Sequence, residues 1–372
     1  MKFLFKYLIT KSKFLSIAYN FDIIFSYVRF YRVIFIAENK SWSILDDGLS
    51  LAMRLNKKYK NFMIILKKPG SFDRKTLHFG SQFVWTSWCD YIHSNNKIIV
   101  TYYHGKPNDD NYMKLHIEKF LSSVNKIDLI LTSTKKNKER LMEWGVQKNK
   151  ISVIPIGLDT KIFTKIKKNI KDKLYANYKI PKDKIIIGSF QKDGVGWAEG
   201  DEPKLIKGPD IFIKSLEKIK NFYDPFVILT GPSRGFVKKG LQNLNIKFKH
   251  FNVSSKKELS ELYNLLDFYF ICSREEGGPK GLLEAMSCGV TVIANNVGMV
   301  DTLIKNTKNG YIVDFKPESF FNCFHLHTNL KKGEKKIFSD NAKRAAENFD
   351  WDNVSMTYFN EISKLEFSKH KE

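Results

Sequence analysis

The chain has 372 residues, of which 43% are hydrophobic, 14% aromatic and 27% charged, with 21 Gly and 10 Pro. This composition excludes a collagen-like, low-complexity or largely disordered chain, because ample apolar surface is available for burial. The four cysteines, Cys89, Cys272, Cys288 and Cys323, form no C-x-x-C pair. A disulfide scaffold or a cysteine zinc site is therefore not expected, and a reducing compartment fits. At roughly 150 residues per domain, the length favours two domains.

The charge is strongly basic, with 62 Lys and Arg against 39 Asp and Glu, a formal net charge of +23. Such a chain is attracted to polyanions, which include nucleic acids, an anionic membrane leaflet and phosphorylated small molecules. The charge alone does not choose among these partners.

Residues 1–28 mix Phe, Leu and Tyr with Lys. No segment reaches the roughly 18 to 20 uninterrupted apolar residues of a spanning helix, and no cleavage-site pattern indicates a signal peptide. This amphipathic segment suits a helix lying on a membrane surface, and equally a helix packed on the first domain.

Short apolar, β-rich runs alternate with helical patterns through the first half of the chain. Strands are predicted at 31–37, 62–66, 97–103, 127–132 and 151–156, with helices at 45–59 and 135–144.

The second half repeats the pattern. Strands are predicted at 184–190, 226–230, 247–252, 268–273 and 290–294, with helices at 209–219, 256–266, 279–287, 300–305 and 351–367.

These strands are continuously apolar, which is typical of parallel sheets covered by helices on both faces. Strand–helix alternation at this spacing requires right-handed βαβ units. We therefore predict an α/β protein of two doubly wound, Rossmann-like domains facing a cleft. The first domain is placed at 1–156, a Lys-rich linker at 157–182, the second domain at 183–350, and a C-terminal helix that crosses back to the first domain at 351–372.

The most informative segment is SREEGGPKGLLEAMSCG, residues 273–289. It follows a buried strand, turns through Gly277 and Gly278, and begins a helix at Pro279, where a missing N–H costs nothing. Amides at a helix N-terminus, together with the helix dipole, form a site suited to phosphate. Carboxylates at Glu276 and Glu284 suit ligands rich in hydroxyl groups.

This segment resembles the signature of the family-4 retaining glycosyltransferases of GT-B fold, roughly S-x-x-E-G-x-P-x-x-L-L-E-A-M-A-C-G-x-P-V-V-A. Further stretches resemble other family elements in the family's order. They are residues 128–145, 151–163, 207–210 (KGPD), 296–298 (NVG), 310–313 (GYIV) and 349–358. One such match would be weak, whereas several in order are specific.

The resemblance implies a role for each matching residue. Glu276 would face the hydroxyls of the donor sugar and Glu284 would hold the ribose of the nucleotide. Lys207 would neutralise the leaving diphosphate, and His104 would lie beside the donor sugar. Backbone groups of the turn and helix start would contact sugar and diphosphate, namely those of Gly277, Gly278, Lys280, Gly281 and Leu282.

Two loops depart from the family pattern. Family members carry Gly-Arg at the end of the second domain's first strand, with the arginine on the diphosphate, whereas this chain has Gly188-Ser189. Lys192, in the long loop that follows, either replaces that arginine as a point charge or is a solvated loop lysine.

In the first domain, residues 38–48 lack the family's Gly-Gly turn. Trp42, Asp46 and Asp47 in this loop either meet the acceptor or mark a capped helix start.

The resemblance implies a retaining enzyme that moves a sugar from a nucleotide-diphosphate donor to a glycan or lipid-linked acceptor in surface polysaccharide or glycolipid synthesis. It implies no cofactor and no metal, and the pair His325 and His327 has no third ligand nearby. Family members are thought to react on the front face, so that Glu276 positions the donor rather than attacking it. A cytoplasmic protein is expected, with attachment to an anionic inner membrane face as a further partner interaction.

Two alternatives stay open. A basic nucleic-acid-binding protein could reuse the fold, although no RNP-like or helix-turn-helix pattern is present and nucleic acid is not the expected partner. A GT-B enzyme that does not transfer sugar, such as an epimerase or a phosphorylase, is the other.

Overall fold

The computed structural model describes residues 28–38 and 43–367 of the chain. The amphipathic segment predicted at 1–28 and the acceptor candidate Trp42 therefore lie outside the described residues, apart from Val28. Among the described residues, no helix is both long enough and apolar enough to span a membrane.

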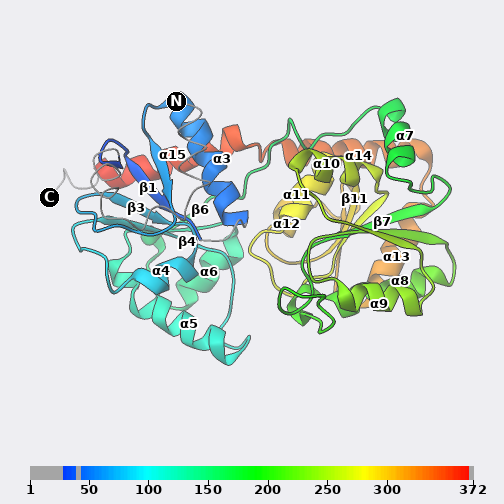
Figure 1. Cartoon of the computed structure of the whole chain (residues 1–372), viewed down its shortest axis with the longest axis horizontal. Coiled ribbons are helices and arrows are strands. Elements are labelled where there is room, and N and C mark those ends of the chain that lie inside the picture. Colours follow the sequence, from blue (N-terminus) through cyan, green and yellow to red (C-terminus); the bar gives the residue numbers. More distant parts are fainter. Residues whose placement is uncertain (1–27, 39–42, 368–372) are drawn as a thin grey trace. The chain divides into compact units, whose positions relative to one another are not determined.

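The first sheet has six parallel strands in the order β2-β1-β3-β4-β5-β6. Four of them, β1, β3, β4 and β6, are labelled in Figure 1. They are β1 (Val33–Ile36), β2 (Met63–Leu66), β3 (Thr76–Phe79), β4 (Lys97–Tyr102), β5 (Leu129–Thr132) and β6 (Ile151–Val153). The helices between them are α3 (Ser43–Lys58), α4 (Gln82–Trp88), α5 (Asn111–Ser122) and α6 (Lys135–Glu143).

The second sheet repeats this architecture in the order β12-β11-β10-β7-β8-β9. Its strands are β7 (Ile185–Phe190), β8 (Pro225–Thr230), β9 (Phe248–Phe251), β10 (Phe268–Ile271), β11 (Thr291–Asn295) and β12 (Tyr311–Val313). Its helices are α7 (Lys168–Asn177), α8 (Pro209–Lys220), α9 (Gly235–Asn243), α10 (Lys256–Leu265), α11 (Lys280–Ser287), α12 (Val300–Leu303), α13 (Pro317–Thr328) and α14 (Lys332–Glu347). The predicted α/β class with two parallel sheets is confirmed.

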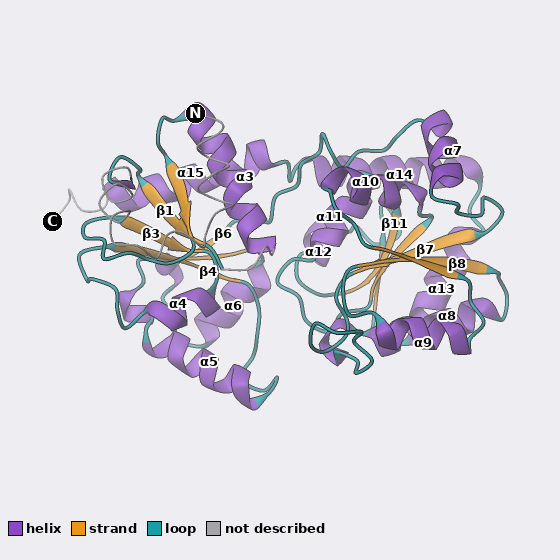
Figure 2. Ribbon diagram, viewed as in Figure 1, coloured by secondary structure: helices purple, strands orange, loops and turns teal. Residues whose placement is uncertain are grey.

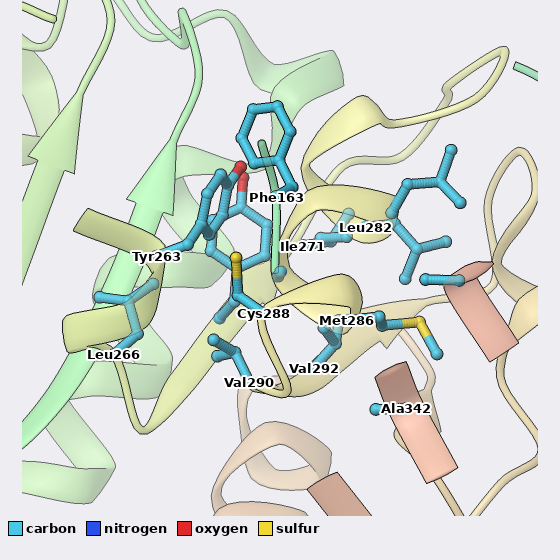
Figure 3. Close-up of a cluster of buried hydrophobic side chains, with 14 of the residues drawn as sticks. Phe163, Tyr263, Leu266, Ile271, Leu282, Met286, Cys288, Val290, Val292 and Ala342 are labelled. Carbon is cyan, nitrogen blue, oxygen red and sulfur yellow. The ribbon is translucent and has the colours of Figure 1, made fainter. Parts of the chain in front are cut away.

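Helices cover both faces of the second sheet (Figure 2). Strand residues alternate between the two hydrophobic clusters, so that Ile186 of β7 packs in one cluster and Ile187 in the other. The cluster drawn in Figure 3 includes Tyr263, Leu282 and Met286, which ties α10 and α11 to the sheet. Because each large aliphatic or aromatic side chain gains about 1.5–3 kcal/mol on full burial, these clusters hold the loop before α11 on a rigid base.

An aspartate precedes one strand of each sheet and bonds the neighbouring strand. Asp128 accepts from the Ile98 amide at 2.6 Å, and Asp267 accepts from the Ile186 amide at 2.8 Å. Each carboxylate satisfies an amide at the start of a ladder, where a strand partner is missing.

The strand order places the chain's reversal between β7 and β10. The chain runs outward from β7 through β8 to β9, then returns to the other side of β7 with β10. In doubly wound sheets ligands bind at the carboxyl ends of the strands, at this switch point. The loops that follow β7 and β10 are therefore neighbours, and both carry predicted site residues.

Several elements were not predicted. They are β3, β12, α4, α5, α7, α9, α13 and α14. The strand β3 is short and carries His78 in its middle, and α7 lies inside the predicted linker. The lysine-rich start of α14 reads as a solvated face, yet the helix buries Phe338 and Ala342.

By its contacts, the chain divides into one unit of residues 1–101 with 122–129 and another of residues 102–121 with 130–372. The predicted domain boundaries themselves stay a prediction.

Within the larger unit, α15 (Trp351–Phe367) contacts β6, because Ser152 donates to Glu361 at 2.5 Å. A Cβ on Gly157 would lie 2.3 Å from the Trp351 ring, which explains why a glycine follows Ile156 in the 151–163 stretch.

Candidate active site

The site is built on the loop between β10 and α11, residues 272–279, which we call the β10–α11 loop. The helix α11 begins at Lys280, one residue later than predicted, with Pro279 at the N-cap. The loop's glycines are required by close packing. A Cβ on Gly277 would lie 2.5 Å from the Tyr103 carbonyl oxygen, and one on Gly278 would lie 2.6 Å from Ile156 Cδ1.

Glu276 and Lys207 form an ion pair at the switch point. Lys207 Nζ lies 2.6 Å from Glu276 Oε1, and the Ser273 hydroxyl donates to the same oxygen at 2.9 Å. The two paired side chains are only 24% and 13% exposed. Burial alone would raise the pKa of Glu276, but Lys207 and Ser273 outweigh it and hold that pKa below its ordinary value. Glu276 is therefore a carboxylate at neutral pH.

Lys207 belongs to the loop that follows β7, residues 191–208, which we call the β7–α8 loop. Gly208 ends this loop with φ +66°, and a Cβ there would lie 1.9 Å from the Cys272 carbonyl oxygen. Only glycine permits both that φ and that approach. The KGPD segment then begins α8, with Pro209 in its first turn as in many helices.

Arg274 fastens the β7–α8 loop from the β10 side. Its amide donates to the Ile206 carbonyl at 2.8 Å. Its guanidinium makes a two-pronged pair with Asp210, at 2.9 and 2.7 Å. On the other side, the Gln191 amide donates to the Lys207 carbonyl at 3.1 Å. Lys207 is thus held over Glu276 from both loops.

His104 follows β4 by two residues. Burial and the Lys207 charge lower its pKa, opposed by Glu276 and Glu275. The structure therefore brings His104 into electrostatic range of the predicted pair, and its imidazole is neutral at neutral pH. Gly105, next in the chain, has φ +118°, a backbone conformation that favours glycine.

Glu275 is a site residue that sequence reasoning missed. Its carboxylate lies 2.7 Å from Arg140 and 3.1 Å from Lys106, and its side chain is 12% exposed. Arg140 and Lys106 fix the position of the Glu275 side chain, whereas the adjacent Glu276 pairs with Lys207. The two adjacent glutamates are visible in the sequence, but no pattern near them indicates Arg140 as the partner of Glu275, because it lies 135 positions away.

Glu284 lies on α11 and accepts a hydrogen bond from the Tyr263 hydroxyl at 2.9 Å. Tyr269, also buried, donates to the Phe190 carbonyl at 3.2 Å. A Cβ on Gly281 would lie 2.4 Å from the Tyr269 hydroxyl, so this glycine makes room for the tyrosines. Neither tyrosine was predicted as part of the site.

Leu282 serves the core. Its side chain is fully buried, and its amide donates to the Pro279 carbonyl at 2.9 Å. Lys280 is half-buried at the first position of α11.

Two further lysines, Lys204 and Lys192, join Lys207 in a cluster beside Glu276. Desolvation, Lys207 and Lys192 lower the pKa of Lys204, and Glu276 opposes them. Lys192, for which replacement of the family arginine and a solvated loop lysine were the two alternatives, lies with its Nζ 4.1 Å from the Trp197 ring centroid. Lys204 was not predicted. Three ammonium groups near one carboxylate leave a positive excess suited to a diphosphate.

Ser189 is buried beneath another cation. Its carbonyl accepts from Arg234 Nη1 at 2.6 Å, and its hydroxyl accepts from Nη2 at 3.0 Å. Arg234 stands after β8, and sequence reasoning did not single it out.

The other residues considered as ligands or acceptor contacts, two histidines and two aspartates, lie on helices and contact neighbouring protein groups. His327 is buried and bonded to Thr291 and Tyr311, while His325 contacts Tyr223. Asp46 and Asp47 lie in the first two turns of α3, and their roles stay a prediction. No cluster of potential metal ligands occurs among residues 28–38 and 43–367.

The two parallel six-stranded sheets with their helices have the GT-B fold of solved glycosyltransferases. A solved glycosyltransferase from Rickettsia africae superposes with a TM-score of 0.66 at 17% identity, covering 90% of this chain and 98% of that chain. Anabaena Alr3699/HepE in complex with UDP and glucose gives a TM-score of 0.71 at 15% identity, with coverages of 89% and 99%. At these identities the likeness shows the fold.

Residues 203–344 match the family model of glycosyl transferases group 1. The matched range contains Lys204, Lys207, Glu276 and Glu284.

Curated relatives agree with the family model. A probable sucrose-phosphate synthase of Thermosipho melanesiensis is 26% identical over 254 residues, covering 63% of this chain and 54% of that protein. A D-inositol 3-phosphate glycosyltransferase of Xylanimonas cellulosilytica is 23% identical over 240 residues, with coverages of 61% and 55%. The chain spans about half the length of these relatives.

Proposed function

We propose that the chain is a retaining glycosyltransferase that takes a sugar from a nucleotide-diphosphate donor. The observation that carries the proposal is the Lys207–Glu276 pair with Lys192 and Lys204 beside it, at the sheet's switch point. A solved protein of the same fold has UDP and glucose bound, which supports a donor of this chemical class. A glycan or lipid-linked acceptor in surface polysaccharide or glycolipid synthesis completes the proposal.

Cleavage of the sugar–diphosphate bond places negative charge on the leaving phosphate. Fixed cations aimed at that charge stabilise the transition state without reorganising, and this is commonly the largest catalytic contribution. In our proposal Lys207 and its neighbouring lysines supply these cations, so no metal ion is required.

Glu276 would accept hydrogen bonds from the donor sugar's hydroxyls. Its depressed pKa keeps it ionised, and Lys207 with Ser273 fixes its orientation. Because Lys207 holds one of its oxygens, we assign it positioning of the donor rather than covalent attack. The leaving phosphate itself would take the proton of the acceptor hydroxyl.

His104 and Glu284 would hold the two ends of the donor. Neutral His104 can donate one N–H to a sugar hydroxyl. Glu284, oriented by Tyr263, would accept from the ribose hydroxyls.

A donor panel tests the proposal. The chain is incubated with UDP-, GDP- and ADP-sugars, and release of the nucleoside diphosphate is measured, with water replacing the unidentified acceptor. We expect release from one donor, lost by at least about 100-fold in Glu276→Ala. Glu217→Ala, an exposed carboxylate on α8, is the matched control and should leave release unchanged.

Other outcomes favour the alternatives. Release that depends on inorganic phosphate indicates a phosphorylase, and a changed sugar still attached to its nucleotide indicates an epimerase. No turnover together with tight binding of single-stranded nucleic acid indicates the binding protein.

Peripheral association with an anionic membrane is a further part of the proposal, based on the net charge of +23. Vesicle flotation that is indifferent to anionic lipid and to removal of residues 1–26 would contradict it.

A further inference from the structure

A buried ion pair lies beneath the β7–α8 loop. Arg234 Nε lies 2.8 Å from Asp193 Oδ1, and the two side chains are 0% and 1% exposed. Arg234 Nη1 also donates to the Ser189 and Thr230 carbonyls, both at 2.6 Å. With Nη2 donating to the Ser189 hydroxyl at 3.0 Å, each guanidinium nitrogen lies within 3.0 Å of an oxygen of the chain itself, so we treat Arg234 as a structural group rather than a ligand group.

The pair lies at the point where the two ends of the loop meet. The Lys204 amide donates to the Asp193 carbonyl at 2.8 Å, and the Val195 amide donates to the Glu202 carbonyl at 2.9 Å. Gly194 and Pro203 form an antiparallel bridge between these bonds. Residues 193–204 are therefore a closed, hydrogen-bonded loop whose base is Asp193.

The far part of this loop is fastened to the start of α9. Amides of Gly235 and Phe236 donate to the carbonyls of Glu199 and Gly200, at 2.6 and 3.0 Å. A Cβ on Gly200 would lie 2.4 Å from the Ser233 carbonyl oxygen. The loop packs against the backbone that carries Arg234, so the ion pair and these contacts act on the same interface.

The lysines follow directly from the base of the loop. Lys192 precedes Asp193 in the chain, and Lys204 is bonded to Asp193 across the loop. The Lys207 amide donates to the Lys204 carbonyl at 2.8 Å, which continues the connection to Glu276. A shift of Asp193 would therefore move the backbone on which all three lysines are mounted.

We infer that Asp193 and Arg234 are positioning residues, which fix the β7–α8 loop so that Lys192, Lys204 and Lys207 converge on one diphosphate. The inference rests on the proposed function. In the family motif an arginine at the position of Ser189 touches the phosphate directly. In this chain the guanidinium of Arg234, at the start of α9, contacts Ser189 and acts through the loop instead.

The test uses inorganic pyrophosphate as the probe, because it needs no knowledge of the base or sugar. Its dissociation constant is measured by calorimetry on the full chain, and thermal unfolding is recorded for every variant. Lys207→Ala shows that the probe occupies the lysine cluster, since its affinity should fall at least 10-fold.

The decisive variant is Asp193→Leu combined with Arg234→Met. A buried ion pair replaced by apolar side chains often keeps stability, whereas removal of one partner leaves an uncompensated charge. We expect a melting temperature near that of the wild type and a pyrophosphate affinity reduced at least 10-fold. Wild-type affinity in this variant overturns the inference and leaves the proposed function standing.

Two further variants keep the test decisive. Glu199 lies on the same loop, and its exposed carboxylate pairs with Lys238 of α9. Glu199→Gln removes this pair and should bind pyrophosphate as the wild type does. Should the double variant not fold, Arg234→Lys retains a charge for Asp193 but cannot reach Ser189 and Thr230 together. A three- to tenfold loss of affinity supports the inference, and an unchanged affinity overturns it. A wild-type chain that binds neither pyrophosphate nor any nucleoside diphosphate overturns both proposals.

Discussion

The β10–α11 loop and the β7–α8 loop meet at one ion pair, yet they are built in different ways. The β10–α11 loop is short, follows the family signature from Ser273 onward, and owes its path to glycines in close backbone contact. The β7–α8 loop departs from the signature and owes its path to a buried ion pair and a closed set of backbone hydrogen bonds. Equivalent positioning can therefore come from a local motif or from long-range pairing.

The largest effect is expected from replacing Lys207, and a smaller one from replacing Lys192 of the same loop. Lys207→Ala removes the cation paired with Glu276 and should lower kcat/KM for the donor by about 100- to 1,000-fold. Lys192→Ala should weaken donor affinity about 10-fold, because its ammonium lies at the edge of the cluster beside Trp197. Steady-state kinetics on the donor found by the panel measures both.

Lys214→Ala, an exposed lysine on α8, is the control for these two variants. Unchanged affinity in Lys192→Ala, with a large loss in Lys207→Ala, would contradict the role of Lys192 as a replacement for the family arginine.

Glycine substitutions compare the end of the β7–α8 loop with the first turn of α11 through stability. Gly208→Ala places a Cβ 1.9 Å from a backbone oxygen at φ +66°, and should cost at least about 3 kcal/mol of unfolding free energy. Gly281→Ala meets the Tyr269 hydroxyl at 2.4 Å and should cost about 1–3 kcal/mol, because the ring can shift. Denaturant unfolding measures both.

Gly333→Ala in α14 is the matched control, since no atom lies within 4 Å of its Cβ position. It should change stability by less than about 1 kcal/mol, toward stabilisation. A Gly208→Ala chain as stable as the wild type would show that Gly208 does not lock the two loops together.

The smallest effect concerns pH and the two paired carboxylates. The pKa of Glu276 is lowered on folding, so the unfolded chain binds more protons and stability falls as the pH drops below about 4.5. Burial raises the pKa of Asp193 against the opposing Arg234, so its contribution has the opposite sign. Glu276→Gln should therefore flatten the acid loss of stability, by at most about 1.4 kcal/mol per pH unit.

Unfolding free energies from pH 6 down to about pH 3 give this slope, with Glu217→Gln as the control. A Glu276→Gln slope equal to that of the wild type would mean that Lys207 does not lower the pKa of Glu276.

Much of the fold could be predicted because its signals are local. The apolar runs that became β4, β7 and β10 indicated buried parallel strands, and the glycines before α11 indicated the turn. Strand order could not be predicted this way, since each central strand is apolar on both faces and pairs with any other.

The candidate site likewise contains residues that a local motif indicates and residues that only a long-range contact indicates. Glu276, Glu284 and Lys207 lie in local motifs, whereas Glu275 with Arg140 and Asp193 with Arg234 join residues 135 and 41 positions apart. Partners at such separations leave no periodic trace in one sequence. Lys204 was missed for another reason, because a lysine in a lysine-rich chain does not stand out from its background.

The lysine cluster has a consequence for turnover under the proposed function. Burial, and after it the charges of Lys207 and Lys192, lower the pKa of Lys204, so the ammonium groups repel one another when no anion is bound. Any diphosphate relieves that repulsion, whether or not a sugar is attached to it. We therefore expect the nucleoside diphosphate product to be released last and slowly. In a closed reaction, inhibition by this product, rather than depletion of the donor, should then limit the rate.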